Sequence, residues 1–182
     1  MGKWENIRIG DITKTNLSVY SIKENWDYVN YLDTGNITMN RITEIQKIML
    51  KDDKLPSRAR RKVNMNNIIY STVRPNQLHY GIIKKQPVNF LVSTGFTVVD
   101  VDEKKANPNF IYYFLSHPDT TAYLQAIGEQ STSAYPSIKP SDIENMKIML
   151  PEKVVQDKIV GILLSLDEKI DLNNKINNNL VT

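Results

Sequence analysis

Basic and hydrogen-bonding side chains gather in three stretches of this sequence of 182 residues. They are the basic run from Arg58 to Lys62, a loop that begins at Arg74 and leads to Lys84, and a polar segment from Gln130 to Lys139. In DNA recognition, Lys and Arg neutralise phosphates, while Arg, Gln, Asn, Ser and Thr match the donors and acceptors on base edges. A solvated loop would explain any one stretch taken alone. Their order along the chain is therefore more informative than any single stretch.

Residues that could support metal or catalytic chemistry are sparse. The sequence holds no cysteine, and its histidines, His79 and His117, stand far apart, which argues against a zinc site. We find no Gly-x-Ser-x-Gly elbow and no phosphate-binding Gly-x-x-x-x-Gly-Lys loop. Asn107-Pro108-Asn109-Phe110 is similar to a motif of amino-methyltransferases, but a helix start explains it. Glu103-Lys104-Lys105 resembles the Glu-x-Lys half of a nuclease site. The Pro-Asp pair of such a site would have to precede it, but the only pair in the sequence, Pro118-Asp119, comes after it. We expect no catalytic residue, cofactor or metal.

The composition is that of one globular domain with an appendage. Hydrophobic residues make up 41% and charged residues 24% of the chain, which is enough to bury a core. The net charge of +3 does not establish nucleic-acid binding, because the potential depends on where the charges lie. No apolar run resembles a signal peptide or approaches the roughly 18 residues that span a bilayer. We expect a cytoplasmic protein without a membrane partner.

The first hundred residues are predicted to form short strands rich in β-branched and aromatic residues. The expected strands cover residues 7–9, 28–32, 37–39, 68–73, 80–83 and 96–101. Beyond them the period changes to about 3.6, which favours helices. Asn107 can cap a first helix, and a second one over 119–127 would end at Gly128 in a left-handed conformation. Ser141 and Glu144 have capping-box spacing before an apolar stretch over 146–150.

The segment 151–182 is predicted to form one long helix that opens with Pro151-Glu152. Its apolar side chains recur in steps of three and four, with Asn173 on the same stripe. About 30 residues would extend roughly 45 Å, more than a small domain covers. An amphipathic helix packed on its own domain is the alternative, but its distal turns would then fray. We expect helix pairing, firmest from Val155 to Ile170, through Val155, Ile159, Ile162, Leu163, Leu166, Ile170, Ile176 and Leu180.

The expected fold class is α+β. A mixed α/β domain of short strands and helices would cover residues 1–150, and a long C-terminal helix that pairs as a coiled coil would cover 151–182. The DNA-contacting loops would lie on the first part, and the pairing surface on the second.

An ordered set of short strings runs along nearly the whole chain. The strings are Tyr31-Leu32-Asp33-Thr34-Gly35-Asn36-Ile37, Asn67-Ile68-Ile69-Tyr70-Ser71-Thr72-Val73-Arg74-Pro75, Ser93-Thr94-Gly95-Phe96, Phe110-Ile111-Tyr112-Tyr113-Phe114-Leu115, Asp142-Ile143-Glu144-Asn145-Met146-Lys147-Ile148, Leu150-Pro151, Gln156-Asp157-Lys158-Ile159 and the run from Leu163 to Ile170. Each string is degenerate, but the set resembles the specificity subunit of type I restriction-modification enzymes.

This resemblance implies a target-recognition domain followed by a spacer helix. Such domains bind double-stranded DNA in the major groove for a methyltransferase (modification) subunit, and the restriction subunit joins through the complex. The helices pair antiparallel and dock the modification subunits, which with the restriction subunit would supply S-adenosylmethionine, Mg and ATP. Because contacts in the family vary with the target, only regions carry over. The expected DNA-binding residues are Arg58, Arg60, Arg61, Lys62, Arg74, Gln77, His79, Tyr80, Lys84, Ser131, Thr132, Ser133, Tyr135 and Lys139.

The usual subunit has two recognition domains and two helices, whereas this sequence has one of each. It would be a natural half-subunit or a fragment. We expect two copies to form a homodimer through the helix, which would suit a split, inverted-repeat DNA site. Two alternatives stay open: the recognition module of a single-chain restriction-methyltransferase, which Met1-Gly2-Lys3-Trp4 at the domain start disfavours, and a coiled-coil adaptor that binds only protein.

Overall fold

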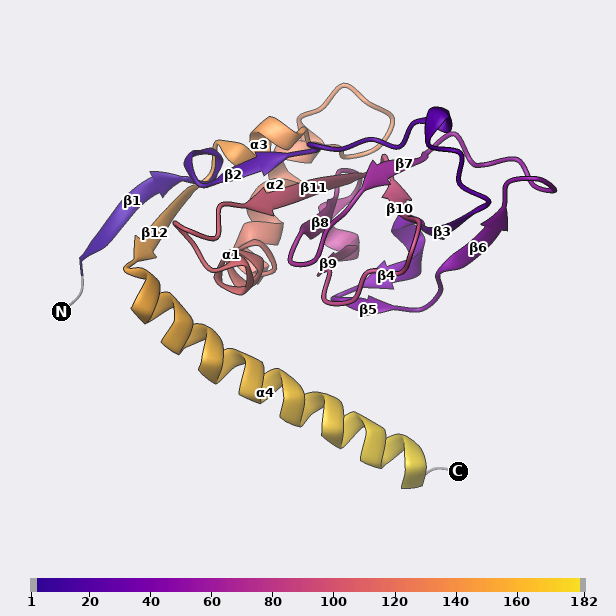
Figure 1. The fold of residues 1–182 in the computed structure, drawn as a ribbon. Helices are drawn as coiled ribbons and strands as arrows, with labels where there is room; N and C mark the ends of the chain where they lie inside the picture. The colour runs from indigo at the N-terminus through magenta and orange to yellow at the C-terminus, as the bar shows by residue number, and fades with distance from the viewer. Residues whose placement is uncertain (1–2, 181–182) are drawn as a thin grey trace.

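The computed structural model describes residues 3–180, and the side chains of residues 3–177. A domain of short strands and helices is followed by one long helix, which confirms the expected α+β fold class (Figure 1). The strands are β1 (Trp4–Arg8), β2 (Thr13–Thr15), β3 (Tyr28–Leu32), β4 (Ile37–Thr38), β5 (Arg41–Ile42), β6 (Gln46–Met49), β7 (Ala59–Lys62), β8 (Ile68–Ser71), β9 (Tyr80–Ile82), β10 (Phe90–Ser93), β11 (Phe96–Val101) and β12 (Lys147–Pro151). The helices are α1 (Pro108–Leu115), α2 (Pro118–Glu129), α3 (Pro140–Glu144) and α4 (Lys153–Leu180), with 3-10 turns η1 (Ile9–Asp11), η2 (Ile22–Glu24), η3 (Thr34–Asn36) and η4 (Pro75–Gln77).

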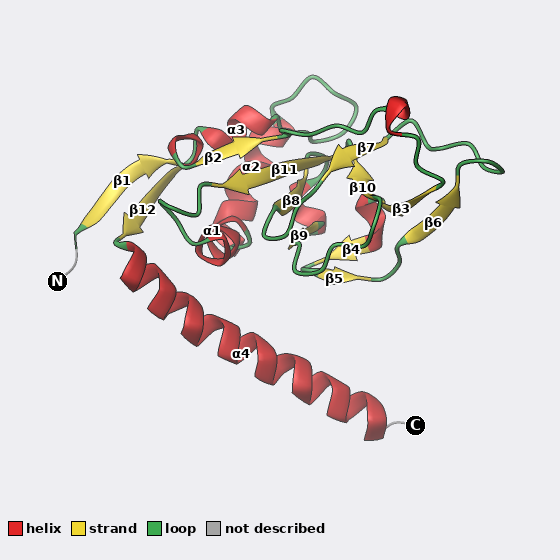
Figure 2. Cartoon of the chain, in the orientation of Figure 1, coloured by secondary structure: helices red, strands yellow, loops and turns green. Residues whose placement is uncertain are grey.

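Two sheets of four strands form the body of the described domain (Figure 2). One has the order β2-β11-β8-β9, and the other has the order β6-β3-β10-β7, in which β3 and β10 run parallel. Ile69 and Val98 of the first sheet pack toward the second sheet. Ile68 and Val99, their neighbours in sequence, pack toward the helices. Successive side chains of a strand point to opposite faces, so this alternation buries β8 and β11 on both sides.

The sequence pattern missed β2, β5, β6, β7 and β10. Strand β7 falls within the basic run, where Arg61 and Lys62 lie opposite Val92 and Leu91 of β10. The alternation of apolar and polar residues that identifies a half-buried strand is absent from this run. Its strand conformation therefore comes from pairing with a distant, fully buried partner.

The predicted start of α1 is confirmed, because the Asn107 side chain accepts a hydrogen bond of 2.9 Å from the Asn109 N–H. The predicted end of α2 was wrong: the helix continues through Gly128, which has no left-handed conformation. A Cβ at Gly128 would lie 3.1 Å from the Ser137 nitrogen. This glycine therefore permits close packing against the following loop.

The predicted capping box of α3 was also wrong. The helix begins at Pro140, and the Asp142 carboxylate accepts the Lys139 N–H at 2.6 Å, so Lys139 occupies the capping position. Glu144, expected to complete the box, instead accepts a hydrogen bond of 2.6 Å from the Thr15 hydroxyl. That contact joins α3 to β2.

The long helix α4 begins at Lys153 rather than at Pro151, because Pro151 pairs with Trp4 at the end of β12. Gln156, which is 1% exposed, anchors it. Its Oε1 accepts the Asn107 N–H and its Nε2 donates to the Pro151 carbonyl, each at 2.8 Å. Figure 1 shows α4 leaving β12 and running below the sheets. Its 28 residues extend about 42 Å at 1.5 Å per residue.

Candidate nucleic-acid interface

One groove of about 450 Å³ brings the three predicted stretches together. Its walls come from η3, the residue before β7, the β8–β9 turn, the β10–β11 turn and the loop between α2 and α3. Figure 1 shows this last loop on the opposite side of the sheets from α4. The lining residues are Thr34, Gly35, Arg58, Ser71, Val73, Arg74, Gln77, His79, Gly95 and Tyr135.

The turn between β8 and β9 has a rare backbone conformation. Arg74 (φ 49°) and Leu78 (φ 58°) flank η4, and both are left-handed, a conformation that few residues other than glycine adopt. The Arg74 N–H donates to the Pro136 carbonyl at 2.8 Å, and Val73 forms an isolated β-bridge with Ser137. The loop between α2 and α3 therefore holds this turn in place.

The same loop brings Tyr135 into the groove. The Ser133 hydroxyl forms hydrogen bonds of 2.8 Å with the hydroxyls of Ser131 and Ser137 and donates to the Tyr135 carbonyl. The Arg74 guanidinium carbon lies 4.3 Å from the centre of the Tyr135 ring, which is a cation–π contact. A cluster of hydroxyls thus fixes the loop, and its aromatic ring supports the arginine.

A glycine and a histidine in the lining make close contacts with neighbouring walls of the groove. A Cβ at Gly95 would lie 2.8 Å from Thr34 Cγ2 and 3.2 Å from Arg58 Nη2, so a larger residue would push these walls apart. In the tautomer that carries its proton on Nδ1, His79 donates to the Ile37 carbonyl at 2.6 Å. Nε2 then stays available as an acceptor.

The described lining contains two arginines and no carboxylate. Asp33, which precedes the lining residue Thr34, balances part of the Arg58 charge. Burial tends to raise the pKa of Asp33, but hydrogen bonds from the Thr34 N–H and the Tyr31 and Ser93 hydroxyls, with the Arg58 charge, hold it below its ordinary value. The groove is therefore complementary to a ligand rich in hydrogen-bond acceptors or negative charge.

Within the basic run, only Arg58 lines the groove. Arg60 lies outside it. Arg61 is half-buried in β7, and its Nε has no hydrogen-bond partner among the described residues. Lys62 forms an ion pair with Glu24. The predicted phosphate contacts of this run are thus supported by position for Arg58 alone, since Lys62 is already neutralised.

From the second stretch, Tyr80 and Lys84 lie outside the groove. Tyr80 is 5% exposed, and its hydroxyl donates to the Ser116 carbonyl at 3.3 Å. It follows His79 directly, and adjacent strand residues face opposite sides, so Tyr80 belongs to the core. Lys84 lies beyond the other end of β9, where it donates to Asn66 at 3.3 Å. Tyr80 therefore belongs to the core, whereas Lys84 is exposed outside the groove, and its predicted DNA contact stays a prediction.

From the third stretch, Tyr135 alone lines the groove. The hydroxyls of Ser131 and Ser133 are hydrogen-bonded to each other within the loop. Thr132 is exposed on that loop, and Lys139 is exposed where it meets α3. None of these four residues lines the groove.

Half of the lining was not predicted from the sequence. These residues contribute backbone and small side chains from turns and from the end of β8, so they carry no charge or unusual composition that would identify them. The indications were the turn signal after Asp33 and the quoted strings from Asn67 to Pro75 and from Ser93 to Phe96. The missed residues are Thr34, Gly35, Ser71, Val73 and Gly95.

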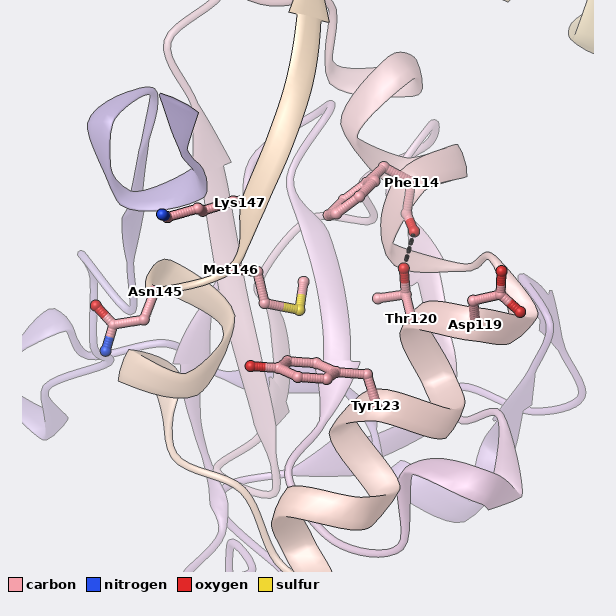
Figure 3. A pocket seen from close by; sticks show the side chains of 7 residues that line it. All are labelled: Phe114, Asp119, Thr120, Tyr123, Asn145, Met146 and Lys147. Atoms are coloured by element: carbon pink, nitrogen blue, oxygen red, sulfur yellow. Dashed lines mark hydrogen bonds between the residues drawn. The ribbon is translucent and has the colours of Figure 1, made fainter. Parts of the chain in front are cut away.

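A second cavity, of about 460 Å³, lies between α1, α2 and the start of β12 (Figure 3). Figure 3 shows the Met146 side chain between the rings of Phe114 and Tyr123, and the Thr120 hydroxyl donates to the Phe114 carbonyl at 2.8 Å. None of the predicted DNA-binding residues lines this cavity. Its lining is Phe114, Asp119, Thr120, Tyr123, Asn145, Met146 and Lys147.

The predicted pairing stripe on α4 is only partly covered by the domain. Its half-buried members are Val155, Ile159 and Leu163. Its exposed members are Ile162 (64%), Leu166 (49%), Ile170 (52%) and Ile176 (48%). The side chain of Leu180 lies outside the described side chains. The helix thus presents an apolar row to solvent along its distal part.

Two further properties concern the part of the chain that the structure describes. None of its helices is long and apolar enough to cross a membrane. No three His, Cys, Asp or Glu side chains lie together in a way that could hold a metal ion.

Comparison with known proteins places this chain in a family. The family model of the type I restriction modification DNA specificity domain matches residues 1–182. The chain is 29% identical over 180 residues to the type I restriction enzyme HindI specificity subunit of Haemophilus influenzae. This match covers 99% of the chain but 39% of that protein, so the chain spans about two fifths of its relative.

Solved structures share the fold. The HsdS subunit from Thermoanaerobacter tengcongensis superposes with a TM-score of 0.78 at 24% identity, covering 95% of this chain and 44% of that one. The S subunit from M. genitalium superposes with a TM-score of 0.61 at 16% identity, covering 93% and 40%. The chain described above therefore belongs to the family of type I restriction modification DNA specificity domains.

Proposed function

We propose that this chain recognises a DNA sequence for a type I restriction-modification enzyme and directs methyltransferase and restriction subunits to it. The groove carries this proposal, because it joins Arg58, Arg74, Gln77, His79 and Tyr135 from three separate segments. These are side chains that contact phosphates and base edges. The chain would supply recognition only, whereas S-adenosylmethionine, Mg and ATP would be bound by the partner subunits.

We further propose that α4 pairs with a like helix, from a second copy of this chain or from a second half of the subunit. The exposed row from Ile162 to Ile176 supports this, because apolar side chains along a helix of about 42 Å gain stability when another helix covers them. Two recognition domains held apart in this way would suit a bipartite DNA target with inverted half-sites.

DNA binding is tested with the chain assembled with its methyltransferase subunit. Fluorescence anisotropy on a duplex, at several salt concentrations, should show an affinity that falls steeply as salt rises. Arg58→Asn should weaken binding and reduce the slope of log affinity against log salt by about 1. Lys104→Asn, which removes the same charge from an exposed turn outside the groove, is the matched control. Binding that is absent, or that does not depend on salt, would favour a protein-only adaptor.

Helix pairing is tested separately by light scattering over a range of concentrations. Wild type should be a dimer, and Leu166→Asp should be a monomer. Ser165→Asp is the control, because Ser165 is exposed and is rotated by about 100° from its neighbour on the helix. A dimer that survives Leu166→Asp would contradict pairing through this stripe, and a monomeric wild type would exclude pairing between two copies of the chain.

A further inference from the structure

We propose that Arg74 reads a guanine base in the major groove of the DNA, and that Tyr135 holds its guanidinium plane for that contact. This inference rests on the proposed function and names the base that one part of the groove recognises. Guanine presents two acceptors, N7 and O6, on its major-groove edge, and an arginine fork matches both at once. A planar group fixed in orientation is suited to such a two-point contact.

Both ends of Arg74 are held in place. Its backbone is left-handed, its N–H donates to the Pro136 carbonyl at 2.8 Å, and its carbonyl accepts the Gln77 N–H at 2.9 Å. Its guanidinium lies 4.3 Å from the centre of the Tyr135 ring. A side chain restrained in this way loses little rotamer freedom on binding.

The Arg74 guanidinium forms no hydrogen bond or ion pair with the described residues, and it lies over the Tyr135 ring. Two other basic side chains of the fold are neutralised, since Arg8 pairs with Asp11 and Lys62 with Glu24. The donors of Arg74 are therefore available to a ligand. The face of the ring supports the guanidinium without consuming any of them.

The neighbours of Arg74 favour a base edge over a phosphate. Gln77 and His79 line the same groove, and both side chains have donor and acceptor capacity. Such groups match the mixed donor and acceptor pattern of base edges, whereas a phosphate offers acceptors alone. Arg58, which lies beside Gly95 in the same groove, would neutralise a phosphate of the same duplex.

The test selects bound sequences from a randomised duplex library, using the chain assembled with its methyltransferase subunit. The variants are Arg74→Lys, which keeps the charge without the planar fork, and Arg74→Asn, which removes the charge but tolerates the left-handed backbone. Wild type should select guanine at one position. Both variants should lose that preference by about tenfold or more while keeping the bases selected elsewhere, and Lys104→Asn should match wild type.

A second measurement tests the contact between Arg74 and N7 of the guanine. Replacing the selected guanine with 7-deazaguanine removes the N7 acceptor, and it should weaken wild-type binding several-fold but leave Arg74→Asn binding unchanged. Tyr135→Phe should retain the guanine preference because it keeps the ring, and Tyr135→Leu should reduce it.

Two results would overturn the inference while leaving the proposed function intact. One is that Arg74→Lys selects the same bases as wild type while Arg74→Asn weakens binding to all duplexes alike, which would make Arg74 a phosphate contact. The other is that 7-deazaguanine affects wild type and Arg74→Asn equally. If wild type selects no sequence at all, both the inference and the proposed function fail.

Discussion

The phenol of Tyr113 on α1 donates a hydrogen bond of 2.6 Å to Oδ2 of Asp167 on α4. One turn further along the helix, Arg41 lies 3.8 Å from Asp171. Burial, with the hydrogen bond to Asp167 and the charge of that carboxylate, raises the pKa of Tyr113 well above its usual range. The phenol therefore remains a donor at neutral pH, and the domain holds α4 well beyond the anchor at Gln156.

Removing this contact should loosen the middle of α4. Tyr113→Phe deletes one hydrogen bond to a charged group, worth roughly 1 kcal/mol at a partly exposed site. Hydrogen exchange of the α4 amides around Asp167 should then speed up by about fivefold. Tyr123→Phe, on α2, should leave it unchanged. Equal protection of α4 in both variants would mean that the contact does not restrain the helix.

Gln156 should be required for the junction between domain and helix. Gln156→Leu would leave the Asn107 N–H and the Pro151 carbonyl buried without partners, each of which costs roughly 1–3 kcal/mol. We expect the free energy of unfolding, measured by urea denaturation, to fall by about 2–4 kcal/mol. Lys158→Leu, at an exposed position of the same helix, should change it by less than about 0.5 kcal/mol. Similar losses in the two variants would contradict the anchoring role.

Substitution by alanine should have different effects on stability at two helical glycines. A Cβ at Gly161 meets nothing within 4 Å, so Gly161→Ala should stabilise the protein by roughly 0.5–1 kcal/mol through helix propensity. At Gly128 the added methyl would lie 3.1 Å from the Ser137 nitrogen, and overpacking costs roughly 1–3 kcal/mol. Gly128→Ala should therefore not stabilise, and it should weaken DNA binding by displacing the loop of Tyr135. Thermal denaturation measures the stability of both variants. If Gly128→Ala were stabilised as much as Gly161→Ala, the loop around Ser137 would move aside without cost.

Lowering the pH should reduce the stability of the fold, in part because Asp33 becomes protonated. Because the pKa of Asp33 is lowered in the fold, its contribution is complete above its unfolded pKa of about 3.9 and is lost as pH falls below that value. Asp33→Asn should therefore lose less stability than wild type between about pH 5 and pH 3 in urea denaturation. Asp11, Glu24 and Asp157, whose pKa values are also lowered, remain in both proteins. Parallel pH curves would exclude a contribution from Asp33.

The strands with clear alternation or β-branched runs, such as β8 and β11, could be predicted from the sequence. Strand β7 could not, because its residues are mostly basic and its pairing with β10 is a long-range contact. Gly128 and Pro151 were misassigned for a related reason. Local propensity favoured a helix end and a helix start, but the packing of Ser137 against Gly128 and the pairing of Trp4 with Pro151 decide the conformation.

The groove likewise contains residues that could be predicted from the sequence and others that could not. Arg74, Gln77, His79 and Tyr135 could be predicted because their types match base and phosphate chemistry. Tyr80 was included wrongly, since strand alternation places it in the core beside His79. Which loops meet at one site depends on tertiary structure, and no local pattern encodes it.

The most direct test of sequence recognition is to map methylated sites in cells that carry this chain with its methyltransferase subunit. One split DNA sequence should be methylated when the wild-type chain is present and should lose methylation when Arg58→Asn and Arg74→Asn are combined. The same sites methylated without the chain, or unchanged methylation with the double variant, would contradict recognition through this groove.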